Sequence, residues 1–208
     1  MLIAGIDKFS LNEFPGHPCI IIFTQGCNFQ CPYCYNPQLI DPKLFGEPLP
    51  EEKVLEFLEL RKKFCDAVVI TGGEPTIHKD LLQFVKKIKK LGYKVKLNTN
   101  GSNPKMLKQL ISKKLIDYVQ MDIKGTWKNY NQLTGKTGVI LEDIKKSINL
   151  VATSKIPNEF RTTDFKYILS EEDIKEIKQY VKLSNHIVNE YLEPTQVISD
   201  YITNSLNN

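Results

Sequence analysis

Ala67-Val68-Val69-Ile70-Thr71-Gly72-Gly73-Glu74-Pro75 is a short apolar run that ends in two glycines, a carboxylate and a proline. A run of this length and composition, closed by turn residues, predicts a buried strand followed by a tight turn. The same pattern recurs along the chain. The predicted strands are Cys19–Thr24, Ala67–Thr71, Lys94–Asn98, Tyr118–Asp122, Glu159–Thr163 and Ile187–Leu192.

Helical patterns separate these strands. Apolar residues recur at helical spacing in four segments, and a fifth begins with a proline that suits a first turn. The segments are Val54 to Phe64, Leu81 to Leu91, Pro104 to Leu110, Leu141 to Val151, and Ile174 to Val181 behind the capping-box-like Ser170–Asp173. Six strands that alternate with five helices predict βαβ crossovers and a parallel sheet.

Polar or glycine-rich residues follow the end of every predicted strand. This is typical of the active-site face of a β/α barrel, whereas an open doubly wound sheet gathers such residues at one switch point. The sequence therefore predicts an α/β fold, a partial (β/α)6 TIM-type barrel, in a single domain over residues 1–208 with its core barrel at about 15–195. The strand-end segments are the loop at Cys27, then 71–75, 98–101, 122–125, 161–164 and Leu192-Glu193-Pro194.

The composition limits the class of protein. A net charge of +4 with 41% hydrophobic and 25% charged residues is that of an ordinary globular chain. The lysines of Lys86–Lys90 are interleaved with apolar residues at helical spacing, which favours a solvated helix face over a nucleic-acid site. No secretory signal and no membrane-spanning run is visible. Five cysteines, three of them closely spaced, indicate a reducing, cytoplasmic setting.

The most distinctive motif is Cys27-Asn28-Phe29-Gln30-Cys31-Pro32-Tyr33-Cys34, which has the spacing C-x3-C-x2-C. Three thiolates in eight residues can hold three irons of a cubane iron–sulfur cluster and leave the fourth iron open for chemistry. The alternative is a zinc site that takes its fourth ligand from His17, Cys19 or Cys65.

Other residues at the strand ends suit a ligand beside an open iron. The two glycines Gly72 and Gly73 let the backbone approach a ligand closely, although an ordinary turn also explains them. Asp122 and Lys124 point to the same side of a strand, so they fit a zwitterion or form a simple ion pair. Arg161 can bind a carboxylate through two parallel hydrogen bonds, or it can form an ion pair at the surface. Together with Tyr33, which can stack on a flat ring, these groups indicate S-adenosylmethionine (SAM).

The chain resembles the radical SAM superfamily through its three cysteines and the segment 72–75. More narrowly, it resembles the activating enzymes of glycyl radical enzymes, above all the longer type of anaerobic ribonucleoside-triphosphate reductase activating protein and, nearby, pyruvate formate-lyase activase. The matching stretches are Lys8–Gly16, Phe23–Phe29, Cys34–Pro37, Asn98–Gly101 and Gln120–Gly125. Tyr35 stands where the pyruvate formate-lyase activase pattern has histidine, and no second cysteine cluster follows Cys34.

The resemblance implies the cofactors and their ligands. Cys27, Cys31 and Cys34 would hold a [4Fe–4S] cluster whose open iron binds the amine and carboxylate of SAM. The residues expected to bind SAM are Tyr33 at the adenine, Gly73 and Glu74 at the methionine amine, and Asp122, Lys124 and Arg161 at the methionyl and ribose part, together with Gly72 and Asn98.

The resemblance also implies a reaction and its partners. Reductive cleavage of SAM would give a 5′-deoxyadenosyl radical, which in activating enzymes removes hydrogen from a glycine of a partner glycyl radical enzyme. A flavodoxin- or ferredoxin-type protein would supply the electron, and no nucleic acid or membrane would be involved. The alternative is a radical SAM enzyme that acts on a small molecule in cofactor or modified-base synthesis.

Overall fold

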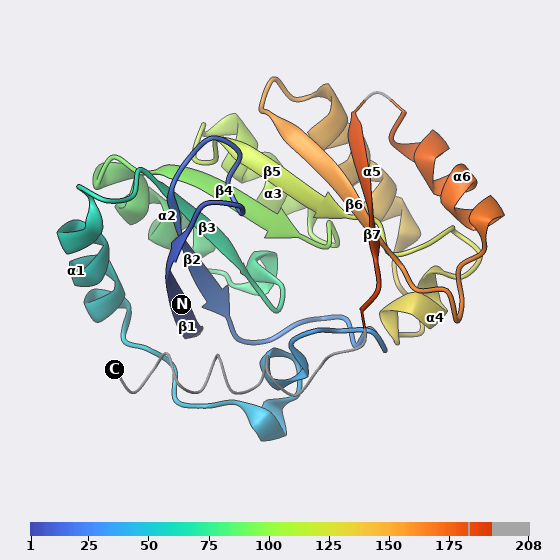
Figure 1. Ribbon diagram of the computed structural model, residues 1–208, viewed down its shortest axis with the longest axis horizontal. Coiled ribbons are helices and arrows are strands. Elements are labelled where there is room, and N and C mark those ends of the chain that lie inside the picture. The colour runs from blue at the N-terminus through green and yellow to red at the C-terminus, as the bar shows by residue number, and fades with distance from the viewer. Residues whose placement is uncertain (183, 193–208) are drawn as a thin grey trace.

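The computed structural model describes residues 1–182 and 184–192, and its centre is one seven-stranded sheet in the order β1-β2-β3-β4-β5-β6-β7 (Figure 1). All five pairings from β2 to β7 are parallel, as predicted. Residues 193 and 194, which were expected to close the last strand, lie outside the described residues. The strands are β1 (Ile3–Ser10), β2 (Cys19–Thr24), β3 (Ala67–Gly72), β4 (Lys94–Thr99), β5 (Tyr118–Asp122), β6 (Asn158–Asp164) and β7 (Asn185–Glu190).

Strand β1 is a seventh strand that was not predicted, and it precedes the six predicted parallel strands. It pairs with β2 in the antiparallel direction, with Ile6 opposite Ile22 and Ser10 opposite Cys19. The sequence pattern did not identify this strand, because Asp7 and Lys8 interrupt its apolar run and only its first half is well buried. A partly exposed antiparallel strand at a sheet edge needs no continuous apolar run.

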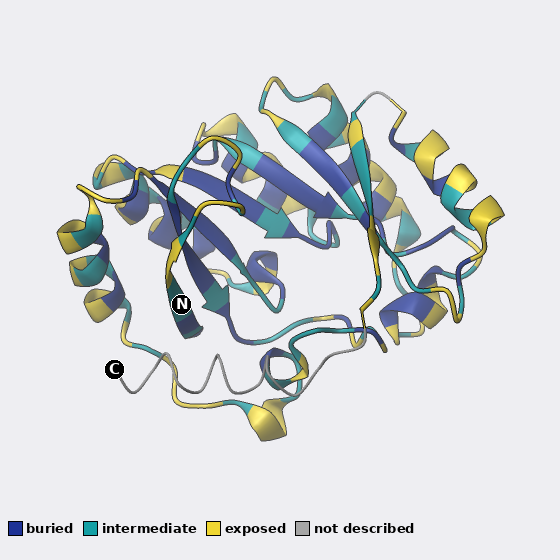
Figure 2. Ribbon diagram, in the orientation of Figure 1, coloured by how far each residue is buried: buried dark blue, intermediate teal, exposed yellow. Residues whose placement is uncertain are grey.

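Six α-helices accompany the sheet in the part of the chain that the structure describes. Helices α2, α3 and α5 lie on one face of the sheet in Figure 1, with their exposed sides turned away from it in Figure 2. The short α4, which follows β5, was not predicted because its single turn is too short to show a period. The helices are α1 (Glu51–Arg61), α2 (Leu81–Lys90), α3 (Pro104–Ser112), α4 (Tyr130–Thr134), α5 (Leu141–Thr153) and α6 (Glu171–Tyr180).

The helix ends follow from local sequence. Pro104 occupies the first turn of α3, and Asn103 caps that turn by accepting a hydrogen bond from the Met106 amide at 3.1 Å. Ser170 and Asp173 form the predicted capping box at the start of α6. Phe64, by contrast, lies beyond the end of α1, and 63% of its surface is exposed. The helix therefore ends earlier than its apolar pattern predicted.

Two apolar clusters lie on opposite faces of the sheet. The larger one joins the sheet to the helices, and the smaller one fills the inner face with Phe14, Cys19, Ile21, Ala67 and Val69. The smaller cluster lies on β2 and β3 and on the segment before β2, whereas the inner face of β4 to β6 is polar. The inner face of the sheet is therefore apolar on β2 and β3 and polar on β4 to β6. No described helix is long and apolar enough to cross a membrane.

Candidate active site

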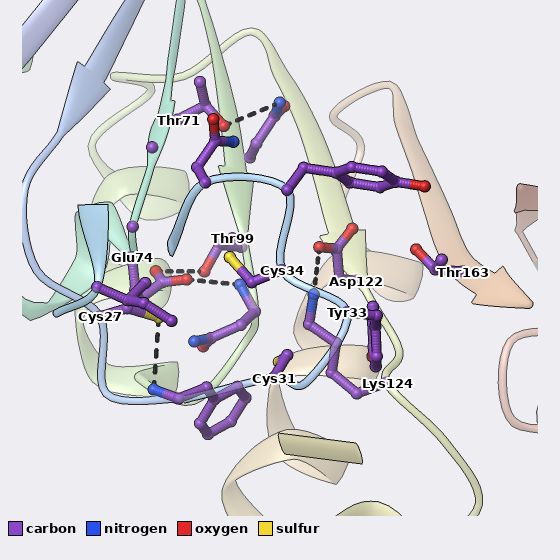
Figure 3. A pocket seen from close by; sticks show the side chains of 18 of the residues that line it. Cys27, Cys31, Tyr33, Cys34, Thr71, Glu74, Thr99, Asp122, Lys124 and Thr163 are labelled. Carbon is purple, nitrogen blue, oxygen red and sulfur yellow. Dashed lines mark hydrogen bonds and ion pairs between the residues drawn. The ribbon is translucent and has the colours of Figure 1, made fainter. Parts of the chain in front are cut away.

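A cavity opens at the carboxyl ends of the parallel strands, where the barrel prediction places the active site (Figure 3). The loop after β2 runs past these strand ends and reaches α4, to which it is tied because the Gln30 amide donates to the Thr134 carbonyl at 2.7 Å (Figure 1). Side chains from four strands and this loop therefore meet in one place. The cavity is lined by Cys27, Phe29, Cys31, Tyr33, Cys34, Tyr35, Asn36, Ile40, Thr71, Gly72, Gly73, Glu74, Asn98, Thr99, Asn100, Gln120, Asp122, Lys124 and Thr163.

The three motif cysteines all line the cavity, and their thiols are free. Burial raises the pKa of Cys27 to about 12, an effect that the nearby Glu74 carboxylate reinforces. Burial also raises the pKa of Cys31. Without a metal, the thiols of Cys27 and Cys31 are therefore protonated at neutral pH, and binding to iron would release their protons.

The donor set that lines the cavity is three thiols on one loop. Over residues 1–182 and 184–192, no three Cys, His, Asp or Glu side chains lie close enough to hold one metal ion. A zinc ion needs its sulfur ligands at about 2.3 Å, whereas a cluster brings its own sulfides and spans more widely spaced thiolates. Three thiols on one loop are therefore a donor set that such a cluster can use.

None of the three residues considered as a fourth zinc ligand lines this cavity. Cys19 lies in the inner apolar cluster, and Cys65 lies in the helix-side core. The ring of His17 lies 2.8 Å from the Asp66 carboxylate and 2.8 Å from the Lys94 amine. The zinc alternative therefore has no closed site among the described residues.

The glycine turn after β3 packs directly against the cysteine loop. Gly73 donates to the Thr24 carbonyl at 2.9 Å, and the Glu74 amide donates to the Gly26 carbonyl at 2.8 Å. A Cβ at Gly73 would lie 1.9 Å from the Gly26 carbonyl oxygen. At Gly72, where φ is +115°, a Cβ would lie 2.2 Å from the Thr24 nitrogen. Both glycines are required for this contact, whatever else they bind.

Glu74 is 1% exposed and held by four hydrogen bonds. Its carboxylate accepts from the amide and hydroxyl of Thr76, from the Thr99 hydroxyl at 2.8 Å and from the Asn100 amide at 2.6 Å. Burial raises the pKa of Glu74, and these four donors act in the opposite direction. The carboxylate thus fixes the turn after β3 against the end of β4.

Asp122 and Lys124 meet as an ion pair at the end of β5. The Lys124 amine donates to Asp122 Oδ2 at 2.8 Å, and both residues line the cavity. Burial lowers the pKa of Lys124, but Asp122 and the nearby Cys31 outweigh this effect and raise it well above its usual value. Figure 3 shows the pair beside Tyr33. The pair therefore presents one anion and one cation to a ligand.

Of three aromatic residues near the strand ends, Tyr33 and Tyr35 line the cavity and Trp127 does not. Tyr33 lines the cavity and packs on Phe165, with ring centroids 5.1 Å apart. Trp127 lies outside the cavity and stacks on Tyr180 at 4.1 Å. Tyr35, whose position has histidine in the pyruvate formate-lyase activase pattern, lines the cavity and accepts a hydrogen bond from the Leu192 amide at 3.0 Å.

Arg161 is the one predicted SAM contact that the cavity does not include. Its guanidinium lies 2.7 Å from Glu159 Oε1, in the ion pair that the sequence left as its alternative. Conversely, sequence reasoning missed Gln120, Thr99, Asn100 and Thr163, which line the cavity. Gln120 precedes Asp122 by two residues, so the alternation of side chains along β5 was the signal that could have found it.

Comparisons with known proteins show the family to which this chain belongs. The chain matches the radical SAM superfamily over residues 21–184, and it belongs to that family. Members of the family are enzymes that use a [4Fe–4S] cluster and SAM. The match begins within β2 and ends at the residue before β7, and it includes every residue predicted to bind the cofactors.

Among curated relatives, the chain is 36% identical over 186 residues to the "Putative glycyl-radical enzyme activating enzyme MJ1227" of Methanocaldococcus jannaschii, covering 87% of this chain and 75% of that protein. It is 32% identical over 145 residues to the "Probable GTP 3′,8-cyclase" of Thermococcus kodakarensis, covering 65% of this chain and 45% of that protein. The chain thus spans less than half the length of this cyclase.

Among solved structures, SuiB of Streptococcus suis bound to the precursor peptide SuiA has a TM-score of 0.66 at 18% identity, covering 90% of this chain and 45% of that one. The SAM-bound structure of SuiB also has a TM-score of 0.66, at 20% identity, covering 88% of this chain and 46% of that one. At these identities the likeness shows the fold alone.

Proposed function

We propose that this protein is a glycyl-radical-activating enzyme, which uses a [4Fe–4S] cluster and SAM to convert a glycine of a partner protein into a glycyl radical. The observation that carries the proposal is the cavity itself, because three free thiols, a glycine turn and an Asp–Lys pair meet there. The similarity to a curated protein named for this activity supports the choice of substrate.

The residues present fit the two cofactors. Cys27, Cys31 and Cys34 would hold three irons, and the absence of a further cysteine from the lining leaves the fourth iron to SAM. SAM would be bound by the predicted residues that line the cavity, each through its own chemistry. These are Tyr33 at the adenine, Gly72, Gly73, Glu74 and Asn98 along the strand ends, and Asp122 and Lys124 at charged or hydroxyl groups.

When bound, the two cofactors supply reductive cleavage: one electron enters, methionine leaves, and the hydrogen atom taken from the substrate ends on 5′-deoxyadenosine. The chain's own residues hold and orient the reacting groups. Glu74 fixes the β3 turn, the Asp122–Lys124 pair would bind the charged groups of SAM, and Phe29 and Ile40 contribute apolar surface to the cavity. A flavodoxin- or ferredoxin-type protein of the same reducing cytoplasm would supply the electron.

A small molecule is the second candidate substrate, favoured by the similarity to the GTP 3′,8-cyclase. GTP is therefore the small molecule to test.

The experiment reconstitutes the protein with iron and sulfide without oxygen, reduces it with dithionite and adds SAM. It compares two substrates, a purified glycyl radical enzyme from the same genome and GTP. We expect 5′-deoxyadenosine to rise with the protein substrate, together with the doublet of a glycine-centred radical in electron paramagnetic resonance. Conversion of GTP without any protein radical would replace the proposal by the second candidate.

A further inference from the structure

A second hollow lies against the cysteine loop, outside the cavity that the thiols line. This outer hollow is formed by Asn28 and Phe29 of that loop, by Ser102 before α3, and by the segment 136–140 that joins α4 to α5. Phe29 lines both the outer hollow and the cavity, whereas none of the three motif cysteines lines the outer hollow. One turn of chain therefore separates the outer hollow from the thiols.

Hydrogen bonds hold this turn of chain in place. The Asn28 side chain donates to Ser102 Oγ at 2.8 Å and accepts from Asn100 Nδ2 at 2.9 Å. Within the same turn, the Cys27 sulfur accepts from the Phe29 amide at 3.4 Å (Figure 3). The thiol of Cys27 and the wall of the outer hollow thus belong to one fixed piece of backbone, and a route between them crosses only that piece.

Positive charge is concentrated in the two segments that contribute to the outer hollow. Of the 28 basic residues, six lysines lie in segments 98–116 and 125–141, which contain no acidic residue; the rest of the chain holds 22 basic residues against all 24 acidic ones. Lys105 and Lys108 on α3 are exposed, and Lys136 lines the outer hollow. None of these three forms an ion pair over residues 1–182 and 184–192. Their charge is therefore available to a partner.

The lining of the outer hollow also offers apolar surface. Ile140 is 64% exposed there. The acidic residue in the lining, Asp143, lies 3.1 Å from the Lys146 amine, which offsets its charge. An exposed apolar residue beside unpaired lysines suits a negatively charged partner, because opposite charge steers the encounter and apolar contact then adds to it.

The position of the outer hollow selects the kind of partner. A substrate bound there would be kept from SAM by the cysteine loop, whereas an electron can cross one turn of chain. We propose that the outer hollow, together with the neighbouring lysines of α3, is the docking surface for an acidic electron-transfer protein, a proposal that rests on the reducible cluster of the proposed function above. One electron leaves that protein, which is oxidised, and crosses the loop between Cys27 and Cys31 to the site that the thiols line.

The test reverses the charge of two of these lysines, in the double variant Lys105→Glu/Lys136→Glu. The probe is a purified flavodoxin from the same genome, reduced to its hydroquinone and mixed with the reconstituted protein without oxygen. Stopped-flow absorbance of the flavin gives the rate constant of electron transfer, and calorimetry gives the affinity between the two proteins. Lys53→Glu/Lys90→Glu, the same change at exposed positions of α1 and α2, is the matched control.

For Lys105→Glu/Lys136→Glu we expect the rate constant and the affinity at low salt to fall at least tenfold, because electrostatic steering changes association rates by about 10- to 1,000-fold. The difference from the unmodified protein should become small at about 1 M salt, where the Debye length is about 3 Å. Lys105→Arg/Lys136→Arg keeps both charges and should react like the unmodified protein. Iron content, complete reduction by dithionite and affinity for SAM should be the same in every variant.

Three other outcomes overturn the proposal. A rate constant equal to that of the Lys53→Glu/Lys90→Glu control removes the outer hollow from electron transfer and leaves the proposed function standing. A loss that persists at high salt, or that accompanies a lower iron content, shows damage to the cysteine loop and not a loss of docking. Weaker binding of the glycyl radical enzyme, with normal oxidation of flavodoxin, assigns the surface to the substrate protein.

Failure of the proposed function has a different signature. Conversion of GTP without any protein radical would refute the glycyl radical enzyme as substrate. The rate constants with flavodoxin would still decide the docking surface, because reductive cleavage of SAM needs the electron whichever substrate follows.

Discussion

At the scale of single residues, the five cysteines fall into two groups according to whether they line the cavity. Three line it, and two pack in apolar clusters. Replacing Cys27, Cys31 or Cys34 by alanine should abolish the cluster, because two thiolates are too few to retain it. Iron content and the absorbance of the reconstituted protein are the measurements.

Cys65→Ala is the matched control, because it removes an equally small thiol from the core. It should keep its iron and lose about 1 kcal/mol of unfolding free energy through packing alone. A colourless Cys65→Ala protein beside a coloured Cys31→Ala protein would refute the ligand assignment.

Asp122 supports a second prediction at this scale. Asp122→Asn should keep the cluster but weaken SAM binding about tenfold, because a hydrogen bond to a charged group contributes about 1.5–3 kcal/mol. Calorimetric titration of the reconstituted protein with SAM measures this loss. Asp143→Asn breaks a comparable ion pair with Lys146 on the surface and is the control. Equal SAM affinity in the two variants would exclude Asp122 from the site.

At the scale of elements, the site depends on the contact between the turn after β3 and the loop after β2. Gly73→Ala would place a Cβ 1.9 Å from the Gly26 carbonyl oxygen, which is backbone and cannot rotate away. We expect a loss of about 1–3 kcal/mol in unfolding free energy and poor cluster retention, because the cysteine loop must shift. Urea unfolding and iron analysis are the measurements.

Gly46→Ala is the control for this contact, since a Cβ there meets nothing within 4 Å. Normal iron retention in Gly73→Ala would show that the cysteine loop is positioned independently of the β3 turn.

The contact between β6 and β7 gives stability a pH dependence. Burial lowers the pKa of His186, and Lys178 adds to this effect. The folded state then binds fewer protons than the unfolded state between the folded pKa and about 6.5, so this contribution to stability is present above pH 6.5 and is lost as the pH falls. His186→Gln should flatten the change in unfolding free energy between pH 7.5 and 5.5.

Urea titrations at the two pH values test this prediction, with the unmodified protein as reference. His78 contributes a change of the same sign, because burial also lowers its pKa. The variant should therefore keep part of the slope. An unaltered slope would show that His186 does not contribute.

At the scale of the whole molecule, the sequence predicted what depends on local pattern. The parallel strands and five of the helices are confirmed, because apolar runs and turn residues alternate along the chain. The three cysteines were predicted to act together because their spacing alone brings them close. Strand β1 was missed, since its burial comes from pairing with β2 and not from an apolar run of its own.

The features that sequence reasoning did not resolve depend on how the sheet is assembled. Arg161 and Glu159 lie two residues apart and share the inner face of β6, but their partnership depends on how deeply that face is buried. Gln120 has no distinctive neighbours in sequence, and its free oxygen is visible only once the sheet is assembled. Such features arise from packing across the barrel, which local patterns do not encode.

The order of the sheet, in which every strand lies beside its sequence neighbours, also bears on biogenesis. A growing chain can add each new strand to an edge that already exists, and few contacts must wait for distant segments. A nascent chain that ends at Asn100 already contains the three thiols, the glycine turn and the donors that hold Glu74. Asp122 and Lys124 leave the ribosome later. Assembly of the iron–sulfur centre can therefore begin during translation, before the cofactor pocket is complete.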